Sequence, residues 1–200
     1  KELVIEAGNV IHDEVERISA LVRNMLNITE IEMGSLRVDR RRTKLRELLQ
    51  DAFDTVARSA KRDDLHFKFE VTQGLGAVNV DKDLMRVAIN NLLTNAIKYN
   101  RPGGQVVLQA EDTDDALILS VIDTGIGISD DDRGRLFHKF YRSGRPEVQA
   151  KSGHGLGLAL AHEIVTLHQG ELRVDSTLDV GSRFTIVLPK TSQLLLKEAG

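Results

Sequence analysis

Apolar residues recur at helical spacing in the first part of the chain. Between residues 1 and 33 they step by four, three, four and three, at Ile11, Val15, Ile18, Val22 and Met25. That spacing is typical of a coiled-coil seam. One helix cannot bury such a stripe alone, so we expect it to pack against a partner helix or, as the alternative, against its own domain. Gly34 is expected to end the helix.

Three further helices are predicted, and polar or glycine-rich breaks separate them. An apolar pattern of about 17 residues begins at Leu45. Asp81 is suited to be the N-cap of a helix that runs through Tyr99, and residues 156–168 form the last helical pattern. The segment 36–43 is interpreted as a solvated basic linker because it holds four arginines: Arg37, Arg40, Arg41 and Arg42.

Alternating or continuous apolar runs predict short strands between these helices. The predicted strands span residues 66–71, 77–80, 105–111, 116–122, 171–176 and 181–188. Residues 129–154 are polar and lack a clear period, so we expect a long loop of the kind that often carries function. Helices and strands alternate without regular βαβ units, which favours an α+β fold with a mixed sheet over a doubly wound sheet.

Composition narrows the classes of protein without assigning a function. The chain has 200 residues, 41% of them hydrophobic, a formal net charge of −3 and no cysteine. We expect one domain of ordinary size with an appendage, no nucleic-acid partner because no overall basic field exists, and a reducing, cytoplasmic setting. No apolar run reaches the roughly 18 residues of a membrane span. Because the chain starts at Lys1, we expect a fragment whose parent protein could be anchored in the inner membrane.

Three polar side chains share one face of the predicted helix that follows Asp81. Asn91, Asn95 and Lys98 stand at positions i, i+4 and i+7, and apolar residues occupy the opposite side. A solvated face is the simpler interpretation, but Asn is a mediocre helix former, and Glu, Lys or Arg would serve better there. An Asn oxygen is a neutral ligand for Mg²⁺ and a Lys is a point charge for phosphate. This face is therefore a candidate metal and phosphate site.

A carboxylate and two glycines follow the predicted strand 116–122. Asp123 would lie at the end of a buried strand, where it can accept a hydrogen bond from an exocyclic amino group such as that of adenine. Gly125 and Gly127 would let the backbone approach a flat ring closely. For a motif this short, an ordinary turn is the alternative interpretation.

Three more glycines open the last predicted helix. Gly153, Gly155 and Gly157 alternate with other residues at its N-terminus, where backbone N–H groups and the helix dipole attract phosphate. The motif is not a P-loop, because no Lys-Ser/Thr pair follows it. Arg142 and Arg145 lie in the preceding loop, from which a cation could reach phosphates.

Four segments resemble motifs of bacterial sensor histidine kinases, in the same order and at the same spacing. NNLLTNAIKYN (90–100) looks like the N box, DTGIGIS (123–129) like the first glycine box, LFHKFYR (136–142) like the F box and GHGLGLAL (153–160) like the second glycine box. The resemblance covers about residues 45–189. It implies the ATP-binding fold shared with gyrase, the ninety-kilodalton heat-shock chaperone and mismatch-repair ATPases. That fold is a two-layer α/β sandwich with a mixed sheet of about five strands and three main helices, here preceded by a long coiled-coil-like helix.

The resemblance also implies roles for individual residues. Asn95 would ligate Mg²⁺ with Asn91 as its helper, Lys98 would contact phosphate, Tyr99 would flank adenine and Asp123 would accept from the adenine amino group. Asn91, Lys98 and Arg142 would be the catalytic residues. The rest of the ATP pocket, its lid and its phosphate contacts would come from Gly125, Gly127, Ile128, Phe137, Phe140, Arg142, Gly153, His154, Gly155, Leu156 and Gly157.

Asn91 bears on the type of reaction. In the ATPase relatives, a Glu one helical turn before the Mg²⁺ ligand activates water, whereas the amide of Asn91 cannot act as a base. Transfer of the γ-phosphoryl to another group is therefore favoured over hydrolysis. A hydrolysing ATPase and a non-catalytic nucleotide-binding or dimerisation module stay open as alternatives.

The first helix resembles the second helix of the family's dimerisation and phosphoacceptor hairpin. Residues 1–35 would be this remnant, 36–44 the linker, 45–190 the catalytic domain and 191–200 a tail. The resemblance implies transfer to a histidine on the absent first helix, relay to a response-regulator aspartate, no autophosphorylation by the fragment alone, and a homodimer through residues 1–33. His12 with Asp13 and Glu14 superficially suggests an acceptor histidine, but it lies in the second-helix pattern and no hairpin follows before Gly34. The chain's other histidines are expected to be structural or on the surface, apart from a lid contact for His154.

Overall fold

The computed structural model describes residues 2–60 and 64–190, which fall into two compact units, Lys1–Arg37 and Val38–Gly200. The first unit is the helix α1 (Glu2–Glu32). It ends where we predicted, because Gly34 follows with a φ of +63°, and its N–H donates to the Ile31 carbonyl oxygen at 3.0 Å. The predicted tail 191–200 lies outside the described residues.

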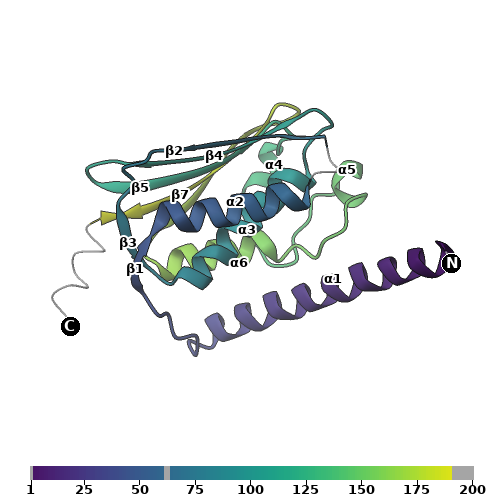
Figure 1. Cartoon of the computed structure of the whole chain (residues 1–200), viewed down its shortest axis with the longest axis horizontal. Helices are drawn as coiled ribbons and strands as arrows, with labels where there is room; N and C mark the ends of the chain where they lie inside the picture. The colour runs from purple at the N-terminus through teal and green to yellow at the C-terminus, as the bar shows by residue number, and fades with distance from the viewer. Residues whose placement is uncertain (1, 61–63, 191–200) are drawn as a thin grey trace. The chain divides into compact units, whose positions relative to one another are not determined.

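The second unit is built on a mixed five-stranded sheet with the order β2-β4-β5-β7-β6. Only the pair β2 and β4 is parallel, and the other neighbours are antiparallel. The strands are β2 (His66–Val71), β4 (Gln105–Asp112), β5 (Ala116–Asp123), β6 (Glu171–Thr177) and β7 (Gly181–Pro189). Three helices cover one face of this sheet: α2 (Leu45–Ser59), α3 (Lys82–Lys98) and α6 (Gly157–Leu167). The predicted α+β sandwich is confirmed (Figure 1).

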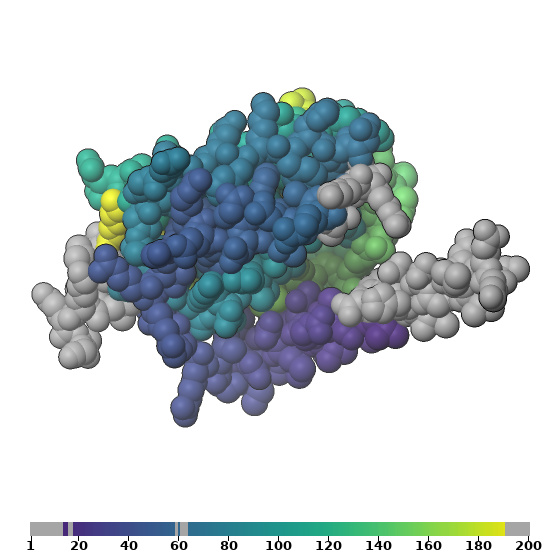
Figure 2. Space-filling view, viewed as in Figure 1, coloured from purple at the N-terminus to yellow at the C-terminus, as the bar shows by residue number. Residues whose placement is uncertain are grey.

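The core lies between the sheet and this helical layer. Alternate residues of the central strands, such as Leu108, Val121 and Ile186, point toward the helices and are fully buried. From the other side, Ile89 of α3 and Leu160 of α6 are equally buried. Burial of this apolar surface supplies most of the free energy that favours folding. Atoms of the segment that carries α2 form a large part of the visible face of this unit (Figure 2).

A small second sheet precedes α2 and α3. β1 (Arg41–Lys44) pairs antiparallel with β3 (Ala77–Val80), so the end of the segment predicted as a solvated linker is a strand. The sequence concealed this strand because only Thr43 of its four residues is buried. The alternation of buried and exposed residues that marks a strand cannot be recognised from one buried position. The paired strand, β3, lies more than thirty residues away in the sequence.

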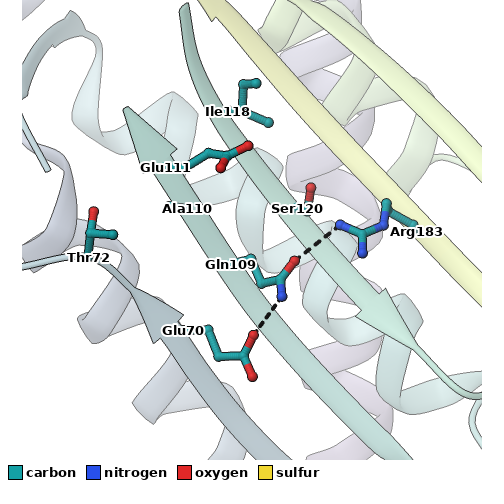
Figure 3. A pocket seen from close by; sticks show the side chains of 8 residues that line it. All are labelled: Glu70, Thr72, Gln109, Ala110, Glu111, Ile118, Ser120 and Arg183. Carbon is teal, nitrogen blue, oxygen red and sulfur yellow. Dashed lines mark hydrogen bonds between the residues drawn. The ribbon is translucent and has the colours of Figure 1, made fainter. Parts of the chain in front are cut away.

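The polar segment 129–154 holds two short helices, α4 (Asp130–Arg133) and α5 (Pro146–Gln149). The opposite face of the sheet is polar: Gln109 donates to Glu70 at 2.6 Å and accepts from Arg183 at 3.1 Å, along a shallow hollow of about 240 Å³ (Figure 3). Among the described residues, no helix combines the length and the apolar composition that a membrane span requires.

Candidate nucleotide site

The polar face of α3 lies at the carboxyl-terminal half of the helix. Asp81 caps the helix as predicted, since its Oδ1 accepts from the N–H groups of Asp83 and Leu84 at 3.1 Å. Nearly three turns later, the Nδ2 of Asn91 donates to the Val87 carbonyl oxygen at 2.9 Å. That hydrogen bond fixes the amide, so that its Oδ1 is left as an acceptor on the outside of the helix.

The glycine motif before α6 lies directly against this face. A Cβ at position 157 would stand 2.6 Å from the Oδ1 of Asn91, and a Cβ at position 153 would collide with the Nζ of Lys98. Only glycine lets the two segments approach this closely. Two motifs that are about sixty residues apart in the sequence therefore form one surface, which carries an amide oxygen and an ammonium group beside the glycine backbone.

Asp123 lies at the end of β5 and is 8% exposed. Burial raises the pKa of its carboxyl group to about 6, although hydrogen bonds from the backbone N–H groups of Gly125 and Ser182 act in the opposite direction. The Gly125 bond to Oδ1 measures 2.8 Å. A buried carboxylate without a cationic partner is costly for the fold, and such groups cluster at functional sites.

The glycine turn after Asp123 is attached to the end of α3. The Ile126 N–H donates to the Tyr99 carbonyl oxygen at 3.0 Å, and a Cβ at position 125 would collide with that same oxygen. Ile128 is held by a hydrogen bond from its N–H to the Ser176 Oγ at 2.9 Å. The predicted adenine-side residues, Tyr99 and Asp123, thus border one turn.

The segment predicted to anchor the lid has one packed and one exposed aromatic ring. Phe137 stacks on His162 of α6 with ring centroids 4.9 Å apart. Phe140 is 62% exposed and has a φ of +63°, a left-handed conformation that is uncommon for a non-glycine residue. Its N–H donates to the Gly155 carbonyl oxygen at 2.9 Å, which connects this segment to the glycine motif.

Both loop arginines are bound to backbone carbonyl groups of the second unit. Arg142 donates to the carbonyl oxygens of Gly153 at 3.0 Å, Val148 at 2.6 Å and Lys151 at 2.6 Å. Arg145 donates to Ile126 at 3.3 Å and Gly127 at 3.4 Å. In this structure Arg142 therefore organises the loop, and its contact with a γ-phosphate stays a prediction.

The side chains fit the metal that the resemblance implies. Within the described residues no group of three or more His, Cys, Asp or Glu could hold a metal ion. In the same part of the chain, the side-chain amide of Asn95 takes part in no hydrogen bond. Asn91 and Asn95 offer neutral oxygens, which are hard ligands that leave the remaining coordination positions of Mg²⁺ to phosphate and water. This donor set suits a metal that arrives with a nucleotide.

The structure therefore brings together the predicted residues of α3, the turn after β5 and the start of α6. His154 is exposed beside these glycines, while Leu156 is buried under the first turn of α6. Sequence reasoning missed Asp132, which is buried in α4 and accepts hydrogen bonds from three hydroxyl groups. Ser129, three residues earlier, has the spacing of a helix cap, but Tyr141 and Ser143 lie in a polar segment without a period.

Comparisons with known proteins agree with this geometry. Residues 80–192 match the family model of histidine kinase-, DNA gyrase B- and HSP90-like ATPases. The chain is 31% identical over 182 residues to the circadian input-output histidine kinase CikA of Synechococcus elongatus, covering 90% of this chain and 24% of CikA. It is 34% identical over 174 residues to the sensor histidine kinase RppB of Synechocystis, covering 86% of this chain and 38% of RppB. The chain thus spans less than half the length of these relatives.

Solved structures of histidine kinases are also similar. The mycobacterial sensor histidine kinase MprB matches with a TM-score of 0.66 and 32% identity, covering 74% of this chain and 97% of that one. Full-length ShkA in complex with AMPPNP matches with a TM-score of 0.75 and 25% identity, covering 86% of this chain and 36% of that one. The chain belongs to the family of histidine kinase-, DNA gyrase B- and HSP90-like ATPases, and its relatives in these comparisons are sensor histidine kinases.

Proposed function

We propose that this chain is the catalytic part of a sensor histidine kinase, which binds Mg-ATP and delivers the γ-phosphoryl group to a histidine on a helix outside this chain. One observation carries the proposal: Asn91 and Lys98 of α3 meet the glycines of residues 153–157, and the turn after the buried carboxylate of Asp123 is attached to the end of the same helix. The AMPPNP bound to the similar kinase ShkA supports a nucleotide as the ligand.

Each end of the site would recognise a different part of the nucleotide. Asp123 would accept a hydrogen bond from the adenine amino group, with Tyr99 beside the ring. Asn95 and Asn91 would hold Mg²⁺, which when bound would neutralise phosphate charge. Lys98 would hold a phosphate, and backbone N–H groups at the start of α6 would bind phosphate oxygens.

The remaining predicted residues would shape the pocket and control access to it. Gly125, Gly127 and Ile128 would form the wall around the adenine, and Phe137 and Phe140 would anchor the lid. Arg142 would reach the γ-phosphate after exchanging its present carbonyl partners for the anion. Catalysis would then consist mainly of positioning and charge neutralisation, because Asn91 offers no base for water.

The parent protein's partners are part of the same proposal. The phosphohistidine would pass its phosphoryl group to an aspartate of a response regulator. Homodimerisation through α1 is supported by four apolar residues at three- and four-residue spacing, each about half exposed: Val15 54%, Ile18 54%, Val22 49% and Met25 56%. Analytical ultracentrifugation of the chain and of a Val22→Glu variant tests this part, and a monomeric wild-type chain would contradict it.

A phosphoryl-transfer assay tests the reaction type. The chain is mixed with γ-labelled ATP, Mg²⁺ and a separately made acceptor hairpin from a similar sensor kinase. Acid-labile label on the hairpin is the expected result. Release of free phosphate without a labelled hairpin would instead indicate a hydrolysing ATPase, and the Asn91→Glu variant provides the comparison for that outcome.

A further inference from the structure

Asp132 of α4 is a buried carboxylate that lies just before the predicted F box (136–142). The residue is 8% exposed, and its oxygens accept hydrogen bonds from three hydroxyl groups: Ser129 at 2.7 Å, Tyr141 at 2.6 Å and Ser143 at 2.8 Å. The guanidinium of Arg135 lies 4.0 Å from the carboxylate. No part of the proposed phosphoryl transfer uses this group.

The choice of a carboxylate has a physical reason. An ionised Asp is purely an acceptor, so it can receive all three hydroxyl protons at once, whereas an Asn amide would turn two donors toward them. Burial alone would raise the pKa of Asp132, but the bonds from Tyr141, Ser129 and Ser143 and the charge of Arg135 lower it. The group therefore stays ionised at neutral pH, and its hydrogen bonds are charge-assisted.

The three donors come from two segments that border the nucleotide site. Ser129 directly follows the turn that contains Gly125 and Gly127, while Tyr141 and Ser143 flank Arg142 on both sides. Arg135 lies over the Tyr141 ring, 4.8 Å from its centroid, and adds a second attachment. The carboxylate thus joins the adenine-side turn to the residue that is expected to reach the phosphates.

The same segment touches the glycine motif through its backbone. The Phe140 N–H donates to the Gly155 carbonyl oxygen at 2.9 Å, and a Cβ at position 155 would lie 2.6 Å from the Tyr141 carbonyl oxygen. Gly155 has a φ of +70°, so its conformation also depends on being glycine. A shift of Tyr141 would therefore move the backbone against which Gly155 is packed.

We propose that Asp132 is a positioning residue for the nucleotide. Together with Ser129, Tyr141 and Ser143 it forms the Asp132 clamp, which holds Arg142 and the glycine motif 153–157 in register with the adenine-side turn. The inference rests on the proposed ATP-binding function. A purely structural residue would affect mainly the stability of the free chain. Loss of the clamp should instead lower the free energy of nucleotide binding by more than it lowers the free energy of unfolding of the free chain.

The test measures affinity for a non-hydrolysable ATP analogue with Mg²⁺ by calorimetry, together with thermal unfolding of each free variant. We expect Asp132→Asn to weaken binding about tenfold, Tyr141→Phe about fivefold and Ser143→Ala about twofold. The double variant Asp132→Asn/Tyr141→Phe should bind no worse than Asp132→Asn, because both changes remove the same interaction. Ser120→Ala is the control: its hydroxyl bonds to Thr185 on the opposite face of the sheet at 3.1 Å, and affinity should not change.

Amide hydrogen exchange of the same variants provides a second readout. Faster exchange should be confined to residues 140–155, the segment that the clamp holds. If the wild-type chain binds the analogue but Tyr141→Phe shows unchanged affinity and unchanged hydrogen exchange, the clamp is overturned and the ATP site is upheld. The Tyr141→Phe variant keeps the test decisive even if Asp132→Asn fails to fold. A wild-type chain that binds no analogue would overturn the proposed function and the clamp together.

Discussion

The two ends of α3 differ in how completely their polar groups are paired. At the amino-terminal end, Asp81 caps the helix with Oδ1, accepts the Asp39 N–H with Oδ2 at 2.9 Å, and donates its own N–H to the Nε2 of His168 at 3.0 Å. His168 is buried and its Nδ1 lies 2.7 Å from the Ile164 carbonyl oxygen. The carboxylate and the N–H of Asp81 and both ring nitrogens of His168 thus have partners within the protein.

The carboxyl-terminal end has the opposite character. The ammonium group of Lys98 lies over the Tyr99 ring, 4.6 Å from its centroid, and near the glycine motif. The Asp123 carboxylate is buried, and burial raises its pKa to about 6. The amino-terminal end of the helix thus secures the fold, while the carboxylate of Asp123, whose turn is attached to the other end, is held in a costly buried state, a common relation between stability and function.

The largest expected effect concerns stability and pH. The folded-state pKa of Asp123, about 6, lies above its ordinary value of 3.8. Between about pH 4 and about pH 6, the carboxyl group is therefore protonated in the folded chain and ionised in the unfolded chain. The free energy of unfolding should therefore fall as pH rises from about 4 to about 6, by up to about 3 kcal/mol from this group.

Urea unfolding of the wild-type and Asp123→Asn chains across pH 4 to 7 isolates this contribution, because the other carboxyl groups cancel in the difference. The variant should lack this loss and should be the more stable chain at pH 7. Parallel stability curves for the two chains would contradict the proposed cost of burying Asp123.

The same substitution should abolish most nucleotide binding. Asn at position 123 would turn an N–H group toward the adenine amino group, so we expect affinity for an ATP analogue to fall about 100-fold. Asp114→Asn, which removes the same charge from an exposed turn, is the matched control and should bind normally. If Asp123→Asn is stabilised but still binds the ATP analogue tightly, the buried charge of Asp123 is not needed for nucleotide binding.

A substitution at the other end of α3 should have the reverse profile. Asp81→Ala removes the cap and the Asp39 contact, and we expect the free energy of unfolding to fall by about 1.5 kcal/mol. Affinity for the nucleotide, measured well below the unfolding temperature, should change less than about threefold. A large loss of affinity would show that the two ends are not independent.

The smallest effect expected from the comparison of the two ends of α3 concerns its contact with α6. Gly157→Ala would press a methyl group against the Oδ1 of Asn91, 2.6 Å away, and shift the amide. We expect nucleotide affinity to fall about fivefold. Gly134→Ala serves as the control, because that glycine has open space around it and an ordinary helical φ of −67°, and equal behaviour of the two variants would refute the close contact.

Much of this comparison was visible in the sequence because it rests on local patterns. The helix from Asp81 to Tyr99 showed a cap, an apolar face and a polar face, and the glycine motifs marked both turns. The strand 41–44 was missed because its single buried residue, Thr43, shows no alternation. The contact between His168 and Asp81 was missed because it depends on packing between distant segments, which spacing along the chain does not encode. The partners Tyr141 and Ser143 of Asp132 are close in sequence, but they lie in a polar segment without a period, so no pattern placed them beside the carboxylate.

Arg142 illustrates the same limit within the site. Its motif predicted a cation near phosphate, but the structure shows it bound to three loop carbonyl groups. Its partner choice depends on the path of residues 146–153, a polar segment without a period, so no sequence pattern predicts it.

Calorimetric titration of the chain with a non-hydrolysable ATP analogue, with and without Mg²⁺, tests the central claim most directly. If the polar end of α3, Asp123 and the glycine start of α6 form a single Mg-ATP site, the titration has a definite outcome. We expect one binding site per chain, with affinity at least about tenfold higher when Mg²⁺ is present. No binding, or binding that is unaffected by Mg²⁺, would contradict this single site.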